Sequence, residues 1–421
     1  MGLTFFKNTF FILVLTCFSC GSKANGNQDV IDSENKTIAA ENQDTILKRV
    51  QDEGKIITGA DQPEKYLPFL KGKKVGVVAN QTSVLFYQDE INIHLVDFLL
   101  QQKIIVTKAF APEHGFRGTA DAGEVIKDGV DSKTGIPLIS LYGKNKKPSA
   151  NQLKDIDIMV FDIQDVGARF YTYISTLHYV MEACAEANIP LLILDRPNPN
   201  GHYIDGPILE TQHNSFVGMH PIPVVHGMTI GEYAHMINGE GWLENKIKCE
   251  LKVVQIANYN HDKIYSLPIK PSPNLPNDQS INLYPSLCFF EGTFVSAGRG
   301  TDSQFQIFGA PSLSKSKYGF NFTPQANEGA KYPKFKGEKC NGIDLREYKK
   351  LDALNLQWLI DAYEASGKRK DFFNDFFTNL AGTKKLQQQI ESGITFSEIK
   401  KSWESGLDQF KIIRKKYLFY N

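Results

Sequence analysis

Carboxylates, amides and arginines follow four apolar segments of this chain. They fall in residues 80–83, 113–118, 162–169 and 195–201. Glycoside hydrolysis needs side chains of this kind. One carboxylic acid protonates the leaving oxygen, and a second group activates water or stabilises the oxocarbenium-like centre. The residue types therefore favour glycosidase chemistry.

Glu113 is the strongest candidate for the acid. It follows an apolar strand and a proline, and Gly115 lets the backbone approach a ligand closely. His114 and Arg117 belong to the same turn and are predicted to bind substrate. The alternative is structural, with Glu113 capping a helix or pairing with Arg117.

The segment 162–169 supplies a second carboxylate. Asp165 is predicted to act as the second catalytic group, because a carboxylate at a strand end can polarise water or hold a sugar hydroxyl. Alternatively, Asp165 pairs with Arg169 or caps the helix that follows. Asn198 stands between two prolines that stiffen its loop, either as a substrate-binding residue or as part of a structural turn.

An arginine and several aromatic residues are candidate binding groups. Arg299 and Asp302 lie in a glycine-rich turn, where an arginine fork can match a carboxylate. The alternative is a β-turn with a surface salt bridge. Tyr171, with Tyr173, Phe305 and Phe308, forms either a sugar-stacking wall or part of the core.

Several familiar catalytic motifs are absent from the sequence. It contains no G-x-S-x-G, no G-x-x-x-x-G-K-[ST] and no H-E-x-x-H, and no G-x-G-x-x-G follows the first predicted strand. Its nine histidines are scattered singly, without metal-ligand spacing. We therefore expect neither a metal nor an organic cofactor.

Alternating strands and helices must position these residues. Apolar strand-like runs occupy 74–80, 106–111, 137–142, 157–162 and 190–194, and helical spacing appears at 92–101 and 170–187. This alternation is typical of a parallel sheet covered on both faces. We predict a Rossmann-like open α/β domain over 61–215, with its polar strand ends gathered on one rim.

Residues 216–421 are predicted to form a smaller, mixed α+β domain. Short strands, prolines and glycines dominate to about residue 345. Thr229 begins a helix over 229–243 and forms a capping box with Glu232. Further helices are expected at 344–366, 384–391 and 397–417.

The first sixty residues are predicted to be a lipoprotein signal peptide and a flexible tether. Residues 1–20 contain an apolar run at 9–18 that is too short to span a bilayer but fits a signal-peptide core. The following Ser19-Cys20-Gly21 is similar to a lipoprotein cleavage site, so Cys20 is the expected lipid attachment point. Residues 21–60 are polar, as in a flexible tether. We expect export and lipid anchoring to the bacterial cell envelope, on its periplasmic side or at the cell surface.

The charge balance limits the classes of partner. The chain has 47 basic and 47 acidic residues, and an even balance does not favour non-specific binding to nucleic acid. No nucleic-acid partner is expected, and membrane contact is expected through the lipid anchor alone.

Nine segments resemble, in the same order, the exo-β-N-acetylmuramidase family, long known only as a domain of unknown function. They are VGVVANQTSV, APEHGFRGTADAGE, DIQDVGARFYTYIST, LDRPNPNG, DGPILE, SFVGMHPIPVVHGMTIGEYA, PSPNLPN, LYPSLCFFEGT and VSAGRGTDSQFQIFGAP. The resemblance runs from about residue 60 to the C-terminus.

The resemblance implies release of terminal N-acetylmuramic acid (MurNAc) from the non-reducing end of peptidoglycan-derived muropeptides. The chief substrate would be its disaccharide with N-acetylglucosamine (GlcNAc). It also implies a cleft between the two domains. Glu113 matches the family's P-E-H-G glutamate, and Asn80, Asp165 and Arg169 match cleft positions. The acetamido group of the substrate is an alternative to a second carboxylate.

Muramic acid carries a lactyl carboxylate that N-acetylglucosamine lacks. A site that distinguishes the two sugars needs a positive group, so Arg169 or Arg299 is expected to bind this carboxylate. Two other functions remain open. One is a non-catalytic periplasmic muropeptide-binding protein. The other is a cell-wall amidase or esterase, which would need a metal or an activated serine.

Overall fold

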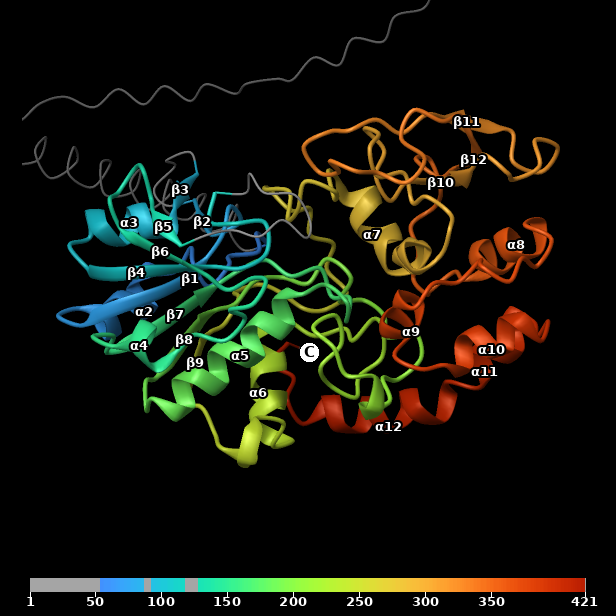
Figure 1. Ribbon diagram of the computed structural model, residues 1–421. Coiled ribbons are helices and arrows are strands. Elements are labelled where there is room, and N and C mark those ends of the chain that lie inside the picture. Colours follow the sequence, from blue (N-terminus) through green and yellow to red (C-terminus); the bar gives the residue numbers. More distant parts are fainter. Residues whose placement is uncertain (1–53, 87–91, 118–127, 421) are drawn as a thin grey trace, which may run out of the picture. The chain divides into compact units, whose positions relative to one another are not determined.

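Apolar segments of the first 254 residues form a seven-stranded sheet (Figure 1). Its strand order is β5-β6-β4-β1-β7-β8-β9, and all neighbours are parallel except β5 and β6. The strands are β1 (Lys74–Ala79), β4 (Ile105–Ala111), β5 (Gly129–Val130), β6 (Pro137–Ser140), β7 (Ile158–Asp162), β8 (Leu191–Leu194) and β9 (Leu251–Val254). This confirms the predicted α/β class. The sheet continues past residue 215, the predicted domain end, because β9 pairs with β8.

Side chains alternate between the two faces of this sheet, as strand geometry requires. Val77, Val160 and Leu192 belong to one hydrophobic cluster with α2 (Pro63–Leu70) and α3 (Leu95–Gln101). The neighbouring Val78, Phe161 and Ile193 belong to the other cluster, with α5 (Tyr173–Glu186) and α6 (Ile230–Gly239). Helices on both faces leave the strand ends as the place where polar side chains gather.

The remaining elements are short. Two antiparallel sheets comprise β2 (Val84–Leu85) with β3 (Ile93–His94), and β10 (Ile307–Ala310), β12 (Cys340–Asp344) and β11 (Phe320–Phe322) in that order. The other helices are α4 (Ala150–Leu153), α7 (Asp278–Leu287), α8 (Gln357–Ala365), α9 (Phe376–Ala381), α10 (Lys385–Glu391), α11 (Phe396–Lys401) and α12 (Glu404–Lys415).

The structure agrees with most predicted elements of the second half. Thr229 caps α6 through the predicted capping box. The helix predicted at 344–366 is present only as α8, because Asp344 ends a strand paired with β10. The helix predicted at 397–417 is divided into α11 and α12.

The computed structural model describes residues 54–86, 92–117 and 128–420. Residues from Ile56 onward form one compact unit. The predicted signal segment, Cys20 and most of the predicted tether lie outside the described residues. Within the described ranges, no helix has both the length and the apolar character needed to cross a membrane.

The C-terminal segment returns to the sheet beside α6 (Figure 1). The hydroxyl of Tyr420 donates to Asp195 Oδ2 over 2.6 Å, just beyond the end of β8. The Phe419 N–H donates to Glu232 Oε1 over 2.8 Å. The C-terminal residues therefore bond to groups at the large sheet, which segments of the first 254 residues form.

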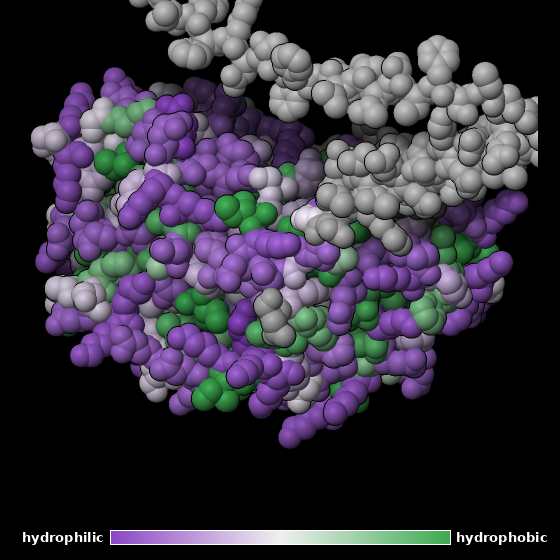
Figure 2. Space-filling view, turned by 180° about the vertical axis from the view of Figure 1, so that it is seen from behind, coloured by the Kyte–Doolittle hydropathy of each residue, from purple (hydrophilic) through white to green (hydrophobic). Residues whose placement is uncertain are grey.

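One face of the molecule is largely hydrophilic, with small separated apolar patches (Figure 2). Large apolar residues that are exposed in the described chain include Val130, Ile264 and Ile412. Scattered apolar residues of this kind are normal on a folded surface.

Candidate active site

A cavity of about 160 Å³ opens at the end of β4 and is lined from both halves of the chain. Glu113, His114 and Thr172 come from loops of the large sheet, whereas Asn274, Glu291 and Arg299 come from the second half. Tyr171, Tyr173, Tyr284 and Phe305 supply aromatic walls. Polar groups converging on a concave, partly aromatic surface are typical of a small-molecule site.

Glu113 is held in this cavity by hydroxyl groups. Thr172 Oγ1 donates to its Oε2 over 2.7 Å, and the Tyr142 hydroxyl bonds the same carboxylate. Burial, together with this neighbouring carboxylate, raises the pKa of the Tyr142 hydroxyl. Thr172 precedes the first residue of α5, so Glu113 also lies near a helix N-terminus, which favours a carboxylate. The arrangement fixes the orientation of the carboxyl group.

The turn after Glu113 has left-handed backbone geometry. His114 has φ 70° and Gly115 has φ 83°. A non-glycine residue in this region carries backbone strain of about 1–3 kcal/mol, and such strain is concentrated at functional sites. His114 is buried and lines the cavity, as predicted for a binding residue.

Two tyrosines form the wall behind Glu113. The hydroxyls of Tyr171 and Tyr173 donate to the Pro271 carbonyl over 2.9 and 3.2 Å. Asn80 Nδ2 donates to the Tyr173 hydroxyl over 2.9 Å. Asn80 is fully buried and is not among the lining residues, so it positions Tyr173 from behind.

The second half contributes an ion pair to the cavity. Arg299 Nη1 lies 3.3 Å from Glu291 Oε2, and its Nη2 donates to the Gly329 carbonyl over 3.0 Å. Lys334 fixes the 3₁₀ helix Cys288–Gly292 that carries Glu291, because its Nζ donates to the carbonyls of Phe290 and Thr293 over 2.8 and 2.7 Å. Burial lowers the pKa of Lys334.

Arg169 lies away from the cavity, which corrects its assignment as a substrate-binding residue. Its side chain is fully buried. Nη1 donates to the carbonyls of 207 and 222 over 2.8 and 2.7 Å, and Nη2 to those of 380 and 381 over 2.9 and 2.8 Å. Both nitrogens are engaged by backbone, so Arg169 is a structural arginine.

Asp165 is also closed off from the cavity. It is buried, and its Oδ2 accepts the Gly167 N–H over 2.7 Å and lies 3.9 Å from His226 Nε2. Burial raises the pKa of this carboxyl group to about 7. The predicted pair with Arg169 is not found, and Asp165 does not line the cavity beside Glu113. The structure thus corrects its assignment as the second catalytic group.

Three other predicted binding residues do not line the cavity. Arg117 lies 3.2 Å from Asp97 and 2.7 Å from Asp131 in an ion-pair network. Asn198 is buried and donates to the Met228 carbonyl over 2.9 Å, which supports its structural alternative. Asp302 is exposed.

Sequence reasoning missed several lining residues. Thr172 stands among aromatic neighbours, and Asn274 lies in a loop without a distinctive chemical pattern. Glu291, in the 3₁₀ helix Cys288–Gly292, is a single carboxylate that carries little signal by itself. The segments PSPNLPN and LYPSLCFFEGT, which resemble the exo-β-N-acetylmuramidase family, contain Asn274 and Glu291. That resemblance is the signal that could have identified both residues.

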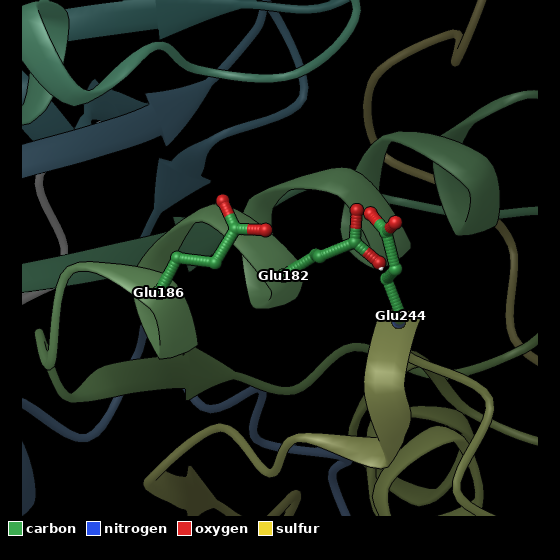
Figure 3. Close-up of side chains that lie close together, drawn as sticks. All are labelled: Glu182, Glu186 and Glu244. Carbon is green, nitrogen blue, oxygen red and sulfur yellow. Dashed lines mark hydrogen bonds between the residues drawn. The ribbon is translucent and has the colours of Figure 1, made fainter.

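Three carboxylates lie together elsewhere on the molecule (Figure 3). Glu182 and Glu186 project from α5, and Glu244 begins a short 3₁₀ helix, Glu244–Lys246. Lys147 Nζ lies 2.8 Å from Glu182 and 2.7 Å from Glu186. Burial alone would raise the pKa of Glu182, but Lys147 and the Glu244 N–H lower it overall. Lys147 thus pairs with two of the three carboxylates.

Two family models match consecutive parts of the chain. The model for the N-terminal part of exo-β-N-acetylmuramidase NamZ matches residues 75–279, and the model for its C-terminal part matches residues 282–420. The chain belongs to the exo-β-N-acetylmuramidase NamZ family. The division between the NamZ models falls near residue 280, beyond β9 and therefore beyond the whole large sheet.

Similar proteins agree with the NamZ assignment. The peptidoglycan β-N-acetylmuramidase NamZ of Bacillus subtilis (strain 168) is 40% identical over 397 residues, covering 87% of this chain and 92% of the relative. Crystal structures of two DUF1343 family proteins from Bacteroides fragilis NCTC 9343 are also similar. The first has a TM-score of 0.80 and 46% identity, covering 87% of this chain and 99% of its own. The second has a TM-score of 0.74 and 29% identity, covering 87% and 100%.

Proposed function

We propose that this protein is an exo-acting glycoside hydrolase that releases terminal MurNAc from the non-reducing end of peptidoglycan fragments during cell-wall turnover. One observation carries the proposal. Glu113, the family-matched glutamate, enters a cavity with a hydroxyl group bonded to its carboxylate. Family membership over both parts of the chain supports the substrate class.

In this mechanism Glu113 is the general acid. Its carboxylic acid form protonates the glycosidic oxygen as the bond to the leaving sugar breaks, and its carboxylate then accepts a proton from the attacking water. Thr172 keeps one oxygen in place, so the other can face the substrate. Such acid–base assistance typically contributes a factor of about 10²–10⁴ to the rate.

The second catalytic group is proposed to come from the substrate. Asp165 is enclosed by protein, and the other cavity carboxylate, Glu291, is paired with Arg299. The 2-acetamido oxygen of MurNAc is covalently held next to the reacting carbon, so it can stabilise the oxocarbenium-like centre without a second free carboxylate. Arg299 is the remaining candidate for the lactyl carboxylate.

The decisive experiment compares wild type with Glu113→Gln on synthetic MurNAc–GlcNAc. We expect kcat/KM to fall about 10³-fold without a change in Tm, because the amide keeps the size of the side chain but cannot donate the required proton. Glu404→Gln, at an exposed site on α12, is the matched control. Full turnover by the Glu113→Gln variant would exclude Glu113 as the acid.

The same measurements separate an enzyme from a binding protein. A muropeptide-binding protein would bind the disaccharide without releasing MurNAc in either variant. NMR of the first product formed would also report its anomeric configuration. Retention is expected from acetamido participation, whereas inversion would require a protein base that activates water directly.

We further propose export and lipid attachment at Cys20. The support is the short apolar run followed by the lipoprotein-like segment Ser19-Cys20-Gly21. Lipid labelling of whole cells is expected to mark the wild type and a Cys17→Ala control. It is expected to leave Cys20→Ala unlabelled, and labelling of that variant would contradict the proposal.

A further inference from the structure

A second concave surface adjoins the cavity. This groove has a volume of about 310 Å³ and shares Glu291 and Arg299 with the cavity. Its other lining residues include Ser296, Tyr332 and Pro333. The cavity and the groove therefore meet at the Glu291–Arg299 ion pair.

Tyr332 gives this groove its chemical character. The residue is 93% exposed, so its ring presents a free face, and Pro333 adds a second apolar surface beside it. Exposure of one aromatic residue is not informative by itself. Its position on a groove that meets the cavity is informative, because sugar rings pack their C–H faces on aromatic rings while their hydroxyls bond neighbouring polar groups.

Neither cation that lines the groove favours an acidic ligand in the groove itself, because Arg299 is the candidate for the lactyl carboxylate of the MurNAc in the cavity and Lys334 is bonded to backbone. Arg299 pairs with Glu291 and the Gly329 carbonyl. Lys334 directs its Nζ at backbone carbonyls, with the shortest bonds to Phe290 and Thr293. A neutral ligand with an apolar face and several hydroxyls fits this surface better than an anionic peptide.

We propose that the groove binds the saccharide on the leaving-group side of the scissile bond, with Tyr332 as its stacking platform. This inference rests on the proposed glycosidase function and adds where the aglycone sugar binds. The cavity would hold the terminal MurNAc, and the groove a neutral N-acetylhexosamine. Tyr332 would thereby determine preference for the leaving group.

Two substrates separate this role from catalysis. MurNAc–GlcNAc fills both surfaces, whereas the β-fluoride of MurNAc fills only the cavity because fluoride is the leaving group. Tyr332→Ala is expected to raise KM for the disaccharide about tenfold, the effect of losing one aromatic contact. It should leave hydrolysis of the fluoride unchanged.

Two variants serve as controls. Tyr332→Phe keeps the ring and should remain within about twofold of wild type. Ile412→Ala removes an exposed apolar side chain on α12 and should match wild type on both substrates. Equal effects of Tyr332→Ala on the two substrates, or no effect on either, would overturn the proposal.

A binding measurement makes the result independent of turnover. In saturation-transfer NMR, methyl β-N-acetylglucosaminide mimics the leaving sugar and should bind wild type but lose most of its signal with Tyr332→Ala. Equal signals from both proteins, or none from wild type, would refute the groove assignment. If wild type hydrolyses neither substrate but this sugar still binds through Tyr332, the glycosidase proposal fails, and with it the leaving-group role, and the groove is a sugar-binding surface alone.

Discussion

Two polar regions of the molecule arise from the same short segment, residues 162–173, but they differ in what surrounds them. Thr172 faces the cavity, where its hydroxyl bonds Glu113. Arg169 and Asp165, a few residues earlier, are enclosed by protein. Within this one segment, Thr172 is thus open to a ligand in the cavity. Arg169 and Asp165 instead support the protein around the cavity.

The enclosed region has a clear structural task. Arg169 joins carbonyls from residues 207, 222, 380 and 381, which belong to three separate segments of the chain. Leu380 also lines the cavity. Arg169 therefore holds the wall of the cavity in place, whereas Glu113 is the proposed general acid.

The largest expected effect is loss of stability in Arg169→Met. This change leaves the carbonyls of 207, 380 and 381 without the arginine donor, while the carbonyl of 222 keeps the Leu209 N–H, and each unsatisfied group costs about 1–3 kcal/mol before relaxation. We expect the free energy of unfolding, measured in urea, to fall by about 3–5 kcal/mol. The fraction that still folds should keep its preference for muramides over glucosaminides.

An unchanged urea midpoint together with lost selectivity for muramides would contradict a structural role for Arg169 and place this residue at the substrate. Arg117→Met is a useful control, because Arg117 also forms ion pairs but is partly exposed. Its smaller expected loss would show that burial, and not arginine pairing in general, determines the size of the effect.

A pH-dependent effect is expected from Asp165→Asn. The pKa of Asp165 is raised to about 7 by burial, against about 3.9 in an unfolded chain. Folding therefore favours proton uptake between about pH 4 and 7, and this contribution to stability is lost as the pH rises through 7. The amide that replaces the carboxyl group is neutral throughout, so the stability of wild type relative to the variant should fall by about 2–4 kcal/mol from pH 4 to pH 8.

Urea unfolding at both pH values measures this difference, with Asp302→Asn as the control at an exposed carboxylate. Parallel stability curves together with abolished turnover would mean that Asp165 acts on the substrate. Asp165 would then belong to the substrate site together with Glu113, and not to the enclosed region.

The smallest effect in this series is expected at Arg299, on the cavity side. Arg299→Met should raise KM for muramides about tenfold and leave glucosaminides unaffected, because only the former carry a lactyl carboxylate. Removing Glu291 as well, in Glu291→Gln/Arg299→Met, controls for the carboxylate left unpaired. Equal losses on both sugars would remove Arg299 from carboxylate recognition.

The sheet was predictable because its strands are continuous apolar runs. The expected strands at 106–111 and 157–162 differ from β4 and β7 by one residue at their starts. Glu113 was predictable for the same reason, since it follows directly from the end of β4. Strand β9 was missed as a member of this sheet because a long connection with a helix separates it from β8.

The division between cavity and interior was not predictable from residue type. Arg169 binds backbone carbonyls, which any residue can supply, so no partner pattern exists in the sequence. Glu291 reaches the cavity from a short 3₁₀ helix held by Lys334, and that contact depends on tertiary structure. The residue types were enough to locate the polar segments in the sequence. The direction in which each side chain points depends on tertiary packing.

The bond between Asp195 and Tyr420 sets an order of events during synthesis. These two residues are 225 positions apart, and a ribosome adds about 5–20 residues per second. Asp195 is therefore translated on the order of 10–45 s before its partner. During that interval the end of β8 lacks the tyrosine that later covers its buried carboxylate. The final residues therefore complete the hydrogen bonds of Asp195 only when synthesis is nearly over.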